Sequence, residues 1–277
     1  MKIALVAFDP RKESTSDHFN SVRKVLENCR RQLIDVCIFP ETTFSGFNFP
    51  NSHLAEYLED SPSLKFFTAE ALRLDISIIF GMFVKSQGSE HIYNSALVVD
   101  RSGKLVSRYD KIHLFSQAGE TDFNREGDAT QTVTIGDATF GLSICYDLRF
   151  PEMFRSISKD CHALVNISNW PSKRETHWDA LLRARAIENQ SFVFGVNRSG
   201  FDDQGNFFNG DGKVYSPWGD LVKPRLIFEE ERVQLFEIDF SQVSKVRESF
   251  PTLADRRFRS LLVNSSELGK RNSGTSV

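Results

Sequence analysis

The chain opens with a short apolar run and then changes to a helical spacing of apolar positions. Residues 2–8 are typical of a buried strand, and residues 18–33 place apolar side chains three and four positions apart, as in an amphipathic helix. A short apolar run at residues 36–39, a helical stretch at 63–74 and an apolar, β-branched run at 76–83 repeat this order. Strands that alternate with helices predict an α/β fold.

The second half of the chain is richer in predicted strands. A polar loop covers residues 116–128, and Gly136-Asp137 between two strand-like segments predicts a hairpin. Pro151 suits the first turn of a helix, and a further helix is expected over about 175–189. We expect one domain over residues 1–263 and a flexible tail over residues 264–277. The remaining predicted strands cover residues 94–99, 105–109, 132–135, 138–144, 163–167, 192–196, 213–215, 221–222 and 233–238.

Composition and charge narrow the classes of function. The 34 basic and 37 acidic residues give a formal net charge of -3 and are spread along the chain rather than gathered in blocks. This distribution disfavours nucleic acid and anionic membranes as partners. No apolar run approaches the length of a membrane span, and the one at residues 2–8 is too short for a signal peptide. Four cysteines without a CxxC pair favour free thiols, so we expect a cytoplasmic protein.

Three residues that could carry chemistry follow predicted strands. Glu41, Lys111 and Cys145 each come directly after an apolar run, and α/β proteins bind ligands at the carboxyl ends of strands. A cysteine there can be a nucleophile, and a half-buried carboxylate can act as a general base. Each residue alone also fits an ordinary role: a packed thiol, a helix cap or surface acid, or a solvated lysine.

The order of these residues and their surroundings resemble the nitrilase superfamily of carbon-nitrogen hydrolases. Residues 39–46 are similar to the glutamate motif of that family, residues 109–115 to its lysine motif and residues 145–152 to its cysteine motif. The resemblance extends from residue 2 to about residue 256. It implies a Glu-Lys-Cys triad in a four-layer α-β-β-α sandwich, which agrees with the α/β pattern above.

The resemblance also implies a role for each residue of the triad. Glu41 would take the thiol proton, and Cys145 would attack the carbonyl of a small amide to give ammonia and a thioester acyl-enzyme, which water then cleaves. Lys111 and the backbone amide of Tyr146 would stabilise the negative oxygen. Members of the family often carry a second glutamate after the lysine motif. Glu120 fits that place and would orient Lys111 and Glu41.

Several neighbouring residues have alternative interpretations. Glu126 is the competing candidate for the second glutamate. Arg149 and Glu152 are expected to anchor the cysteine turn by ion pairing rather than to touch substrate. A thiol protease or transferase would instead pair Cys145 with His113 or His177, but it would leave the strand-end glutamate and lysine unexplained.

Within the superfamily, the chain resembles the omega-amidase-like branch, whose members hydrolyse small omega-amides of 2-oxo acids. The resemblance rests on residues 169–171 and 178–186. Asn169 and Trp170 are therefore candidates for substrate binding, together with Arg174, because an acidic substrate needs a basic residue in its pocket. An N-carbamoyl amidase and a true nitrilase share the triad and stay open. A non-catalytic binding protein on the same fold is the alternative outside the enzymes.

Cofactors and partners follow from the same observations. The sequence contains no HExxH, no paired Cys-His spacing, no calcium loop and no glycine-rich phosphate loop, so we expect neither a metal nor another cofactor. The expected partner is a small-molecule amide substrate. The family resemblance implies a homodimer that pairs through the helix after Cys145 and the helix over about 175–189.

Overall fold

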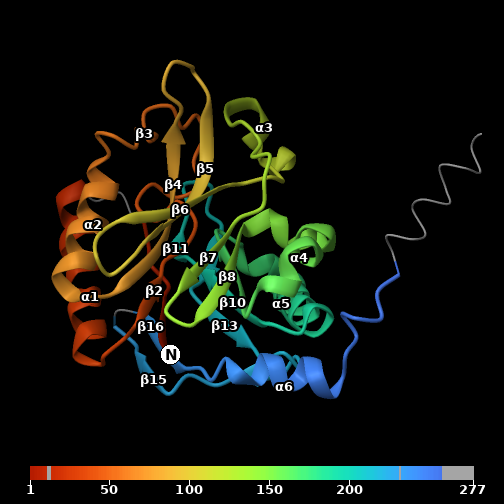
Figure 1. The fold of residues 1–277 in the computed structure, drawn as a ribbon. Coiled ribbons are helices and arrows are strands. Elements are labelled where there is room, and N and C mark those ends of the chain that lie inside the picture. The colour runs from red at the N-terminus through yellow and green to blue at the C-terminus, as the bar shows by residue number, and fades with distance from the viewer. Residues whose placement is uncertain (11–13, 231, 258–277) are drawn as a thin grey trace, which may run out of the picture.

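The fold is built from two β-sheets that pack face to face (Figure 1). The computed structural model describes residues 1–10, 14–230 and 232–257. The predicted domain end at residue 263 and the predicted tail at 264–277 lie outside these described residues. Among the helices that the structure describes, none combines the length and the apolar character needed to cross a bilayer.

The first sheet has the strand order β15-β16-β1-β2-β4-β5-β6, and β3 lies beside β4. β1, β2 and β4 run parallel, and the connections between them contain helices α1 (Thr15–Arg31) and α2 (Pro62–Leu74). The two predicted strand-helix-strand units are therefore confirmed. The strands are β1 (Lys2–Val6), β2 (Val36–Ile38), β3 (Glu56–Tyr57), β4 (Ser77–Lys85), β5 (Ile92–Val99), β6 (Leu105–Asp110), β15 (Leu226–Phe228) and β16 (Val233–Glu237).

The second sheet has the order β14-β13-β10-β9-β8-β7, with β8, β9 and β10 parallel. The predicted hairpin is present: Ile135 pairs with Ala138, and Gly136 takes the left-handed conformation that this short turn requires. A separate hairpin joins β11 to β12. The strands are β7 (Thr132–Ile135), β8 (Ala138–Ile144), β9 (Ala163–Ser168), β10 (Phe192–Asn197), β11 (Ser199–Phe201), β12 (Phe207–Asn209), β13 (Gly212–Tyr215) and β14 (Leu221–Val222).

The alternation of side chains along β1 shows how the layers form. Ile3 and Leu5 join the core between the two sheets, whereas Ala4 and Val6 join the core under α1 and α2. On the far side, α4 (Pro151–Ile157) and α5 (Glu175–Asn189) cover the second sheet (Figure 1). The result is the four-layer α-β-β-α sandwich that the sequence predicts.

Several short elements differ from the sequence-based expectation. The predicted polar loop at 116–128 contains η1 (Ser116–Ala118) and α3 (Glu120–Phe123), and α6 (Ser241–Ser249), β3, β11, β12 and β15 were not predicted. Helix α1 starts at Thr15 because Ser14 caps it by accepting a hydrogen bond from the Asp17 amide. Short 3-10 turns also occur at η2 (Cys145–Arg149), η3 (Ser158–Asp160) and η4 (Ser172–Arg174). Such elements are too short for a hydrophobic period to reveal them.

Candidate active site

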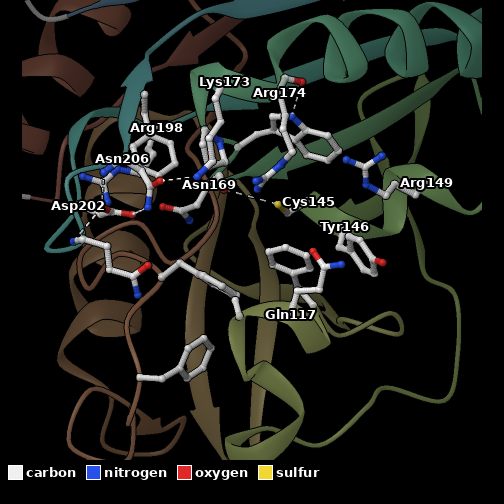
Figure 2. Close-up of a pocket in the computed structure, with 18 residues that line it drawn as sticks. Gln117, Cys145, Tyr146, Arg149, Asn169, Lys173, Arg174, Arg198, Asp202 and Asn206 are labelled. Atoms are coloured by element: carbon white, nitrogen blue, oxygen red, sulfur yellow. Dashed lines mark hydrogen bonds between the residues drawn. The ribbon is translucent and has the colours of Figure 1, made fainter.

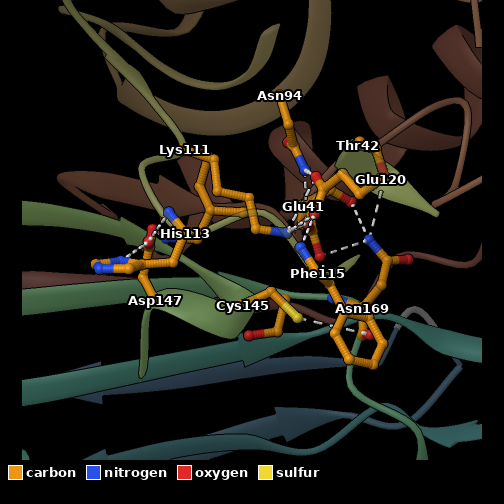
Figure 3. Close-up of polar contacts among 12 residues, drawn as sticks. Glu41, Thr42, Asn94, Lys111, His113, Phe115, Glu120, Cys145, Asp147 and Asn169 are labelled. Atoms are coloured by element: carbon orange, nitrogen blue, oxygen red, sulfur yellow. Dashed lines mark hydrogen bonds and ion pairs between the residues drawn. The ribbon is translucent and has the colours of Figure 1, made fainter. Parts of the chain in front are cut away.

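The three predicted catalytic residues meet at one end of the gap between the sheets (Figure 3). Glu41 follows β2 and Lys111 follows β6, both in the first sheet, while Cys145 follows β8 in the second. β2 and β6 run in the same direction, because β5 is antiparallel to both β4 and β6. The sandwich therefore gathers the carboxyl ends of strands that are far apart in the sequence.

A buried cluster of charges forms the centre of this site. Lys111 Nζ lies 3.0 Å from Glu41 Oε1 and 2.9 Å from Glu120 Oε2, and all three side chains are inaccessible to solvent. Burial alone would lower the pKa of Lys111, but the carboxylates of Glu120 and Glu41 outweigh this effect and raise the pKa above its usual value. Lys111 is therefore a cation at any physiological pH.

Asn94, in β5, joins the two carboxylates. Its Nδ2 donates to Glu41 Oε1 at 2.7 Å and to Glu120 Oε1 at 2.9 Å. Glu120 also accepts a hydrogen bond of 2.7 Å from the Phe115 amide, which fixes it at the start of α3. The competing candidate Glu126 is exposed. The structure thus places Glu120, not Glu126, beside Lys111, and it adds Asn94 as a residue that the sequence analysis did not identify.

A tight approach of β4 holds the glutamate loop in position. The Thr43 amide donates to the Gly81 carbonyl at 2.8 Å. A Cβ at Gly81 would come within 2.7 Å of Glu41 Cα, so this position requires glycine. Thr42 adopts a left-handed φ of 44°, which turns the chain directly after Glu41. Glu41 is therefore held in place by backbone contacts of its loop as well as by its own hydrogen bonds.

The turn that carries Cys145 is fixed by a buried aspartate. Cys145 has a φ of 45°, in the left-handed region, at the junction of β8 and η2. Asp147 accepts hydrogen bonds from the Ile144 amide at 2.9 Å and from the Tyr109 hydroxyl at 2.7 Å. It also accepts one of 3.0 Å from the His113 amide. Asp147 thereby ties the lysine segment to the cysteine turn.

The anchoring of this turn differs from the ion pairs expected for Arg149 and Glu152. Arg185, on α5, donates to the Leu148 carbonyl at 2.8 Å. Arg149 instead lies over the Trp170 ring, with Cζ 4.7 Å from the ring centroid. Within the described residues, neither Arg149 nor Glu152 takes part in an ion pair, and Glu152 is exposed. The hydrogen bonds of the buried Asp147 and Arg185 therefore anchor the turn in place of the expected ion pair.

The thiol of Cys145 lies close enough to Glu41 to feel its charge, and it lines a cavity. Its Sγ lies 3.8 Å from the Asn169 carbonyl oxygen. Burial raises the pKa of the Cys145 thiol well above its usual value, and the negative charge of Glu41 raises it further, while Lys111 acts in the opposite direction. The thiol is therefore protonated in the free protein and needs a base before it can attack.

A cavity of about 260 Å³ opens beside Cys145 (Figure 2). Phe47, Phe49 and Phe115 supply apolar walls. One acidic residue, Asp202, lines the cavity, together with four basic residues: Arg149, Lys173, Arg174 and Arg198. Within the described part of the chain, Arg149, Lys173 and Arg174 form no ion pairs, whereas Arg198 pairs with Asp9 at 3.3 Å. The cavity suits a small ligand that carries negative charge.

The predicted substrate residues lie on this cavity in different ways. Arg174 extends over the Phe115 ring, with Cζ 5.6 Å from its centroid. The Trp170 indole nitrogen donates to the Arg174 carbonyl at 2.8 Å, so Trp170 supports the wall. Asn169 lines the cavity, but its amide nitrogen donates to Glu41 and Thr42. Tyr146 is in the cavity wall next to Cys145.

The alternative with a Cys-His pair has no geometric support. His113 Nδ1 lies 2.8 Å from Asp147 Oδ1, and its ring stacks on Phe150 with 3.8 Å between the centroids. His177 is exposed on α5. Among the described residues, no group of three or more His, Cys, Asp or Glu side chains is arranged to hold a metal ion.

Comparisons with known proteins agree with this site. The carbon-nitrogen hydrolase family model matches residues 2–248. Omega-amidase YafV of Escherichia coli (strain K12) is 33% identical over 221 residues, which cover 80% of this chain and 84% of that protein. The 2-oxoglutaramate amidase of Bacillus subtilis (strain 168) is 33% identical over 229 residues, which cover 80% of this chain and 85% of that protein.

A solved structure gives the same result for the fold. The CN-hydrolase superfamily protein from Xanthomonas campestris, which carries an arsenic adduct in its active site, superimposes with a TM-score of 0.84 at 30% identity. The match covers 93% of this chain and 97% of that one. The chain therefore belongs to the carbon-nitrogen hydrolase family of the nitrilase superfamily, resembles its omega-amidase-like branch, and is a hydrolase of carbon-nitrogen bonds other than peptide bonds.

Proposed function

We propose that the protein is an omega-amidase, which converts the terminal amide of a small 2-oxo acid such as 2-oxoglutaramate to a carboxylate and ammonia. The observation that carries this proposal is the unpaired positive charge of Arg149, Lys173 and Arg174 around the cavity at Cys145. A neutral amide would leave these cations without an anionic partner, whereas a 2-oxo carboxylate supplies one. The relatives named as omega-amidase and 2-oxoglutaramate amidase support the same substrate class.

The proposed mechanism begins with the protonated thiol. Glu41 takes the proton of Cys145 as Sγ bonds to the amide carbon, and the carbonyl electron pair moves onto oxygen. When the tetrahedral state collapses, the carbon-nitrogen bond breaks, and Glu41 returns the proton to the departing ammonia. A thioester acyl-enzyme remains. Water then gives a proton to Glu41, attacks the thioester and releases the acid and the thiol.

Lys111 has a double role in this proposal. Its cation offsets part of the negative charge of Glu41 and Glu120, and it stabilises the oxyanion together with the backbone amide of Tyr146. Lys111 Nζ makes two contacts with Glu120, of 2.9 and 3.2 Å, which one hydrogen can share. An ammonium group has three hydrogens. One donates to Glu120 and one donates to Glu41, so the third is left for the substrate oxygen.

Ammonia release from a panel of substrates tests the proposal. The panel contains 2-oxoglutaramate, 2-oxosuccinamate, glutamine, asparagine, propionamide, an N-carbamoyl amino acid and a nitrile. We expect 2-oxoglutaramate to be preferred over glutamine, because the ammonium group of glutamine would face the basic wall. Cys145→Ala should abolish turnover. A preference for the carbamoyl compound or the nitrile, or silence across the panel, would contradict the omega-amidase assignment.

A charge-specific variant makes the test sharper. Arg174→Met keeps much of the length of the side chain but removes the cation. We expect kcat/KM for 2-oxoglutaramate to fall roughly ten- to hundredfold, as for the loss of a charge-assisted hydrogen bond of about 1.5–3 kcal/mol. The kcat/KM for propionamide, which carries no charge, should stay within about threefold of its starting value by the same argument. Equal losses for both substrates would mean that Arg174 does not recognise the acid group.

We also propose a homodimer and a cytoplasmic location. An apolar surface patch formed by Ile187, Trp218 and Phe250 supports the homodimer. Ile187 lies on α5, which is one of the two helices expected at the contact. The four cysteines are unpaired thiols, which is in keeping with a reducing compartment.

A further inference from the structure

Glu41 accepts hydrogen bonds at every position that a carboxylate offers (Figure 3). Oε1 accepts from Lys111 Nζ at 3.0 Å and from Asn94 Nδ2 at 2.7 Å. Oε2 accepts from the Asn169 amide at 2.8 Å and from Asn169 Nδ2 at 3.3 Å. Two oxygens provide about four acceptor positions, so the carboxylate has none left. A base in this state cannot take a proton until one donor leaves.

Asn169 Nδ2 is the donor that can leave at the lowest cost. Its contact with Glu41 Oε2 is the longest of the four. The same nitrogen also lies 2.8 Å from the Glu41 carbonyl oxygen and 3.1 Å from Thr42 Oγ1. Three acceptors thus share two hydrogens. Both hydrogens can turn to the carbonyl and the hydroxyl, which vacates Oε2 without leaving an N–H unsatisfied.

The orientation of this side-chain amide follows from its surroundings. In the reverse orientation, the amide oxygen would face the Glu41 carboxylate and the Glu41 carbonyl, both of which only accept hydrogen bonds. In the present orientation Asn169 Oδ1 is buried and has no hydrogen-bond partner within the described residues. The position of Nδ2 between Glu41 and Thr42 is therefore the one that the contacts require.

The main chain of Asn169 links Oε2 of Glu41 to Cys145. Its N–H donates to Glu41 Oε2, and its carbonyl oxygen is the contact of Cys145 Sγ. Oε1, in contrast, faces Lys111 and Asn94. Oε2 is thus the oxygen whose two donors both come from Asn169, the residue that also contacts the thiol, and it is the one from which a donor can be released.

We propose that Oε2 of Glu41 carries the catalytic proton and that the Asn169 side chain is a positioning group that vacates this oxygen as the proton arrives. The S–H bond of Cys145 breaks, its proton bonds to Oε2, and the sulfur electron pair forms the bond to the amide carbon. The amide hydrogen of Asn169 moves from Oε2 to Thr42 Oγ1. The proposal rests on the role of Glu41 in the proposed function.

Two variants should move the pH profile in opposite directions. Asn169→Ala removes a donor from the carboxylate, so protonation becomes easier and the acidic limb of kcat/KM moves to higher pH, by about half to one unit. Thr42→Val removes the alternative acceptor and keeps the amide on Oε2. Protonation then becomes harder, so the limb moves to lower pH and kcat falls about three- to tenfold. The β-branched valine matches the shape of Thr42.

Matched controls separate this effect from a loss of structure. Thr43→Val removes a buried hydroxyl from the next residue, whose contacts are with Pro40 and Gly81. We expect it to leave the acidic limb in place. Glu41→Gln should be inactive.

Each outcome of this set supports or overturns the proposal. Opposite shifts for Asn169→Ala and Thr42→Val support it. Acidic limbs that stay in place, or that shift in the same direction in both variants, overturn it. A rise of KM at constant kcat in Asn169→Ala also overturns it, because that result would mark a substrate contact. If Glu41→Gln keeps its activity, the proposed function fails as well. An inactive Glu41→Gln with unmoved limbs would remove only the role of Asn169.

Discussion

At the scale of single residues, Cys145 combines a position in the wall of the cavity with a protonated thiol. Its left-handed backbone turns the side chain out of the end of β8 toward the cavity. Burial and the charge of Glu41 nevertheless raise the pKa of the Cys145 thiol, and the nearby Lys111 only partly opposes them. In the proposed mechanism, Cys145 is therefore activated by proton transfer within the substrate complex and is not stored as a thiolate.

The protonated state of the Cys145 thiol predicts how Cys145 reacts with iodoacetamide in the absence of substrate. The thiolate is the reactive form, and a raised pKa means that its population is small at neutral pH and grows as pH rises. The alkylation rate should therefore increase steadily from pH 6 to pH 9 without a plateau, as followed by mass spectrometry. Cys145→Ala is the control, because Cys29, Cys37 and Cys161 are fully buried. A plateau near neutral pH would contradict the prediction.

The sequence predicts the residues of the site to different degrees. Glu41, Lys111 and Cys145 each stand in a local motif directly after a strand, so the sequence identifies them, and Glu120 follows from its distance to the lysine motif. Asn94 lies within β5, and only the pairing of β4, β5 and β6 brings it to both carboxylates. The prediction that Arg149 forms an ion pair was wrong, because its contact, the Trp170 ring, follows a different strand and is not apparent from the local sequence.

At the scale of elements, α6, the last helix that the structure describes, connects two layers through Arg247. Its guanidinium donates to the carbonyls of Ser158 and Cys161 at 2.8 Å each, to Ser191 Oγ at 2.9 Å and to the Gln190 carbonyl at 3.2 Å. These acceptors lie where α4, through η3, and α5 lead into β9 and β10. One side chain thus satisfies polar groups at the ends of two helices.

Loss of this contact should destabilise the fold. Arg247→Ala leaves several carbonyls without a donor, and we expect the free energy of unfolding to fall by about 2–3 kcal/mol. Lys245→Ala, on the same helix, removes an exposed ion pair with Asp239 and an exposed hydrogen bond to Ser241 Oγ. It should change the free energy of unfolding by less than about 0.5 kcal/mol. Urea unfolding of the two variants measures the difference. Equal stability of the two variants would show that the hydrogen bonds of Arg247 do not stabilise the fold.

The alternation of side chains explains which elements the sequence predicts. Residues along β1 and β2 point alternately to two different cores. The long apolar face of α1 gives a regular pattern of its own, so the sequence identifies these elements. α6 buries only Val243 and Val246, and the β11-β12 hairpin has three residues in each strand. Their places are set by contacts with distant residues, which no local period records.

At the scale of the whole molecule, the sandwich leaves an apolar area on one outer layer. Ile187 on α5 is about half exposed, as are Trp218 and Phe250. The Trp218 and Phe250 rings stack, with 5.8 Å between their centroids. A Cβ at Gly219 would lie 2.5 Å from Ile187, so the turn after β13 is packed directly on α5. These residues form one continuous apolar patch, of the kind that marks an interface.

If the patch is the dimer contact, a charge placed in it should separate the subunits. We expect size-exclusion chromatography with light scattering to give twice the 31.6 kDa of one chain, and Trp218→Glu to shift the protein to the single-chain mass. Leu72→Glu is the matched control: Leu72 is also exposed, but it lies on α2 in the opposite outer layer, so this variant should stay dimeric. A 31.6 kDa species for the unchanged protein would contradict the homodimer itself. A dimer that survives Trp218→Glu would instead place the contact elsewhere, with α4 as the next helix to test, because the family resemblance expects both helices of this layer at the contact.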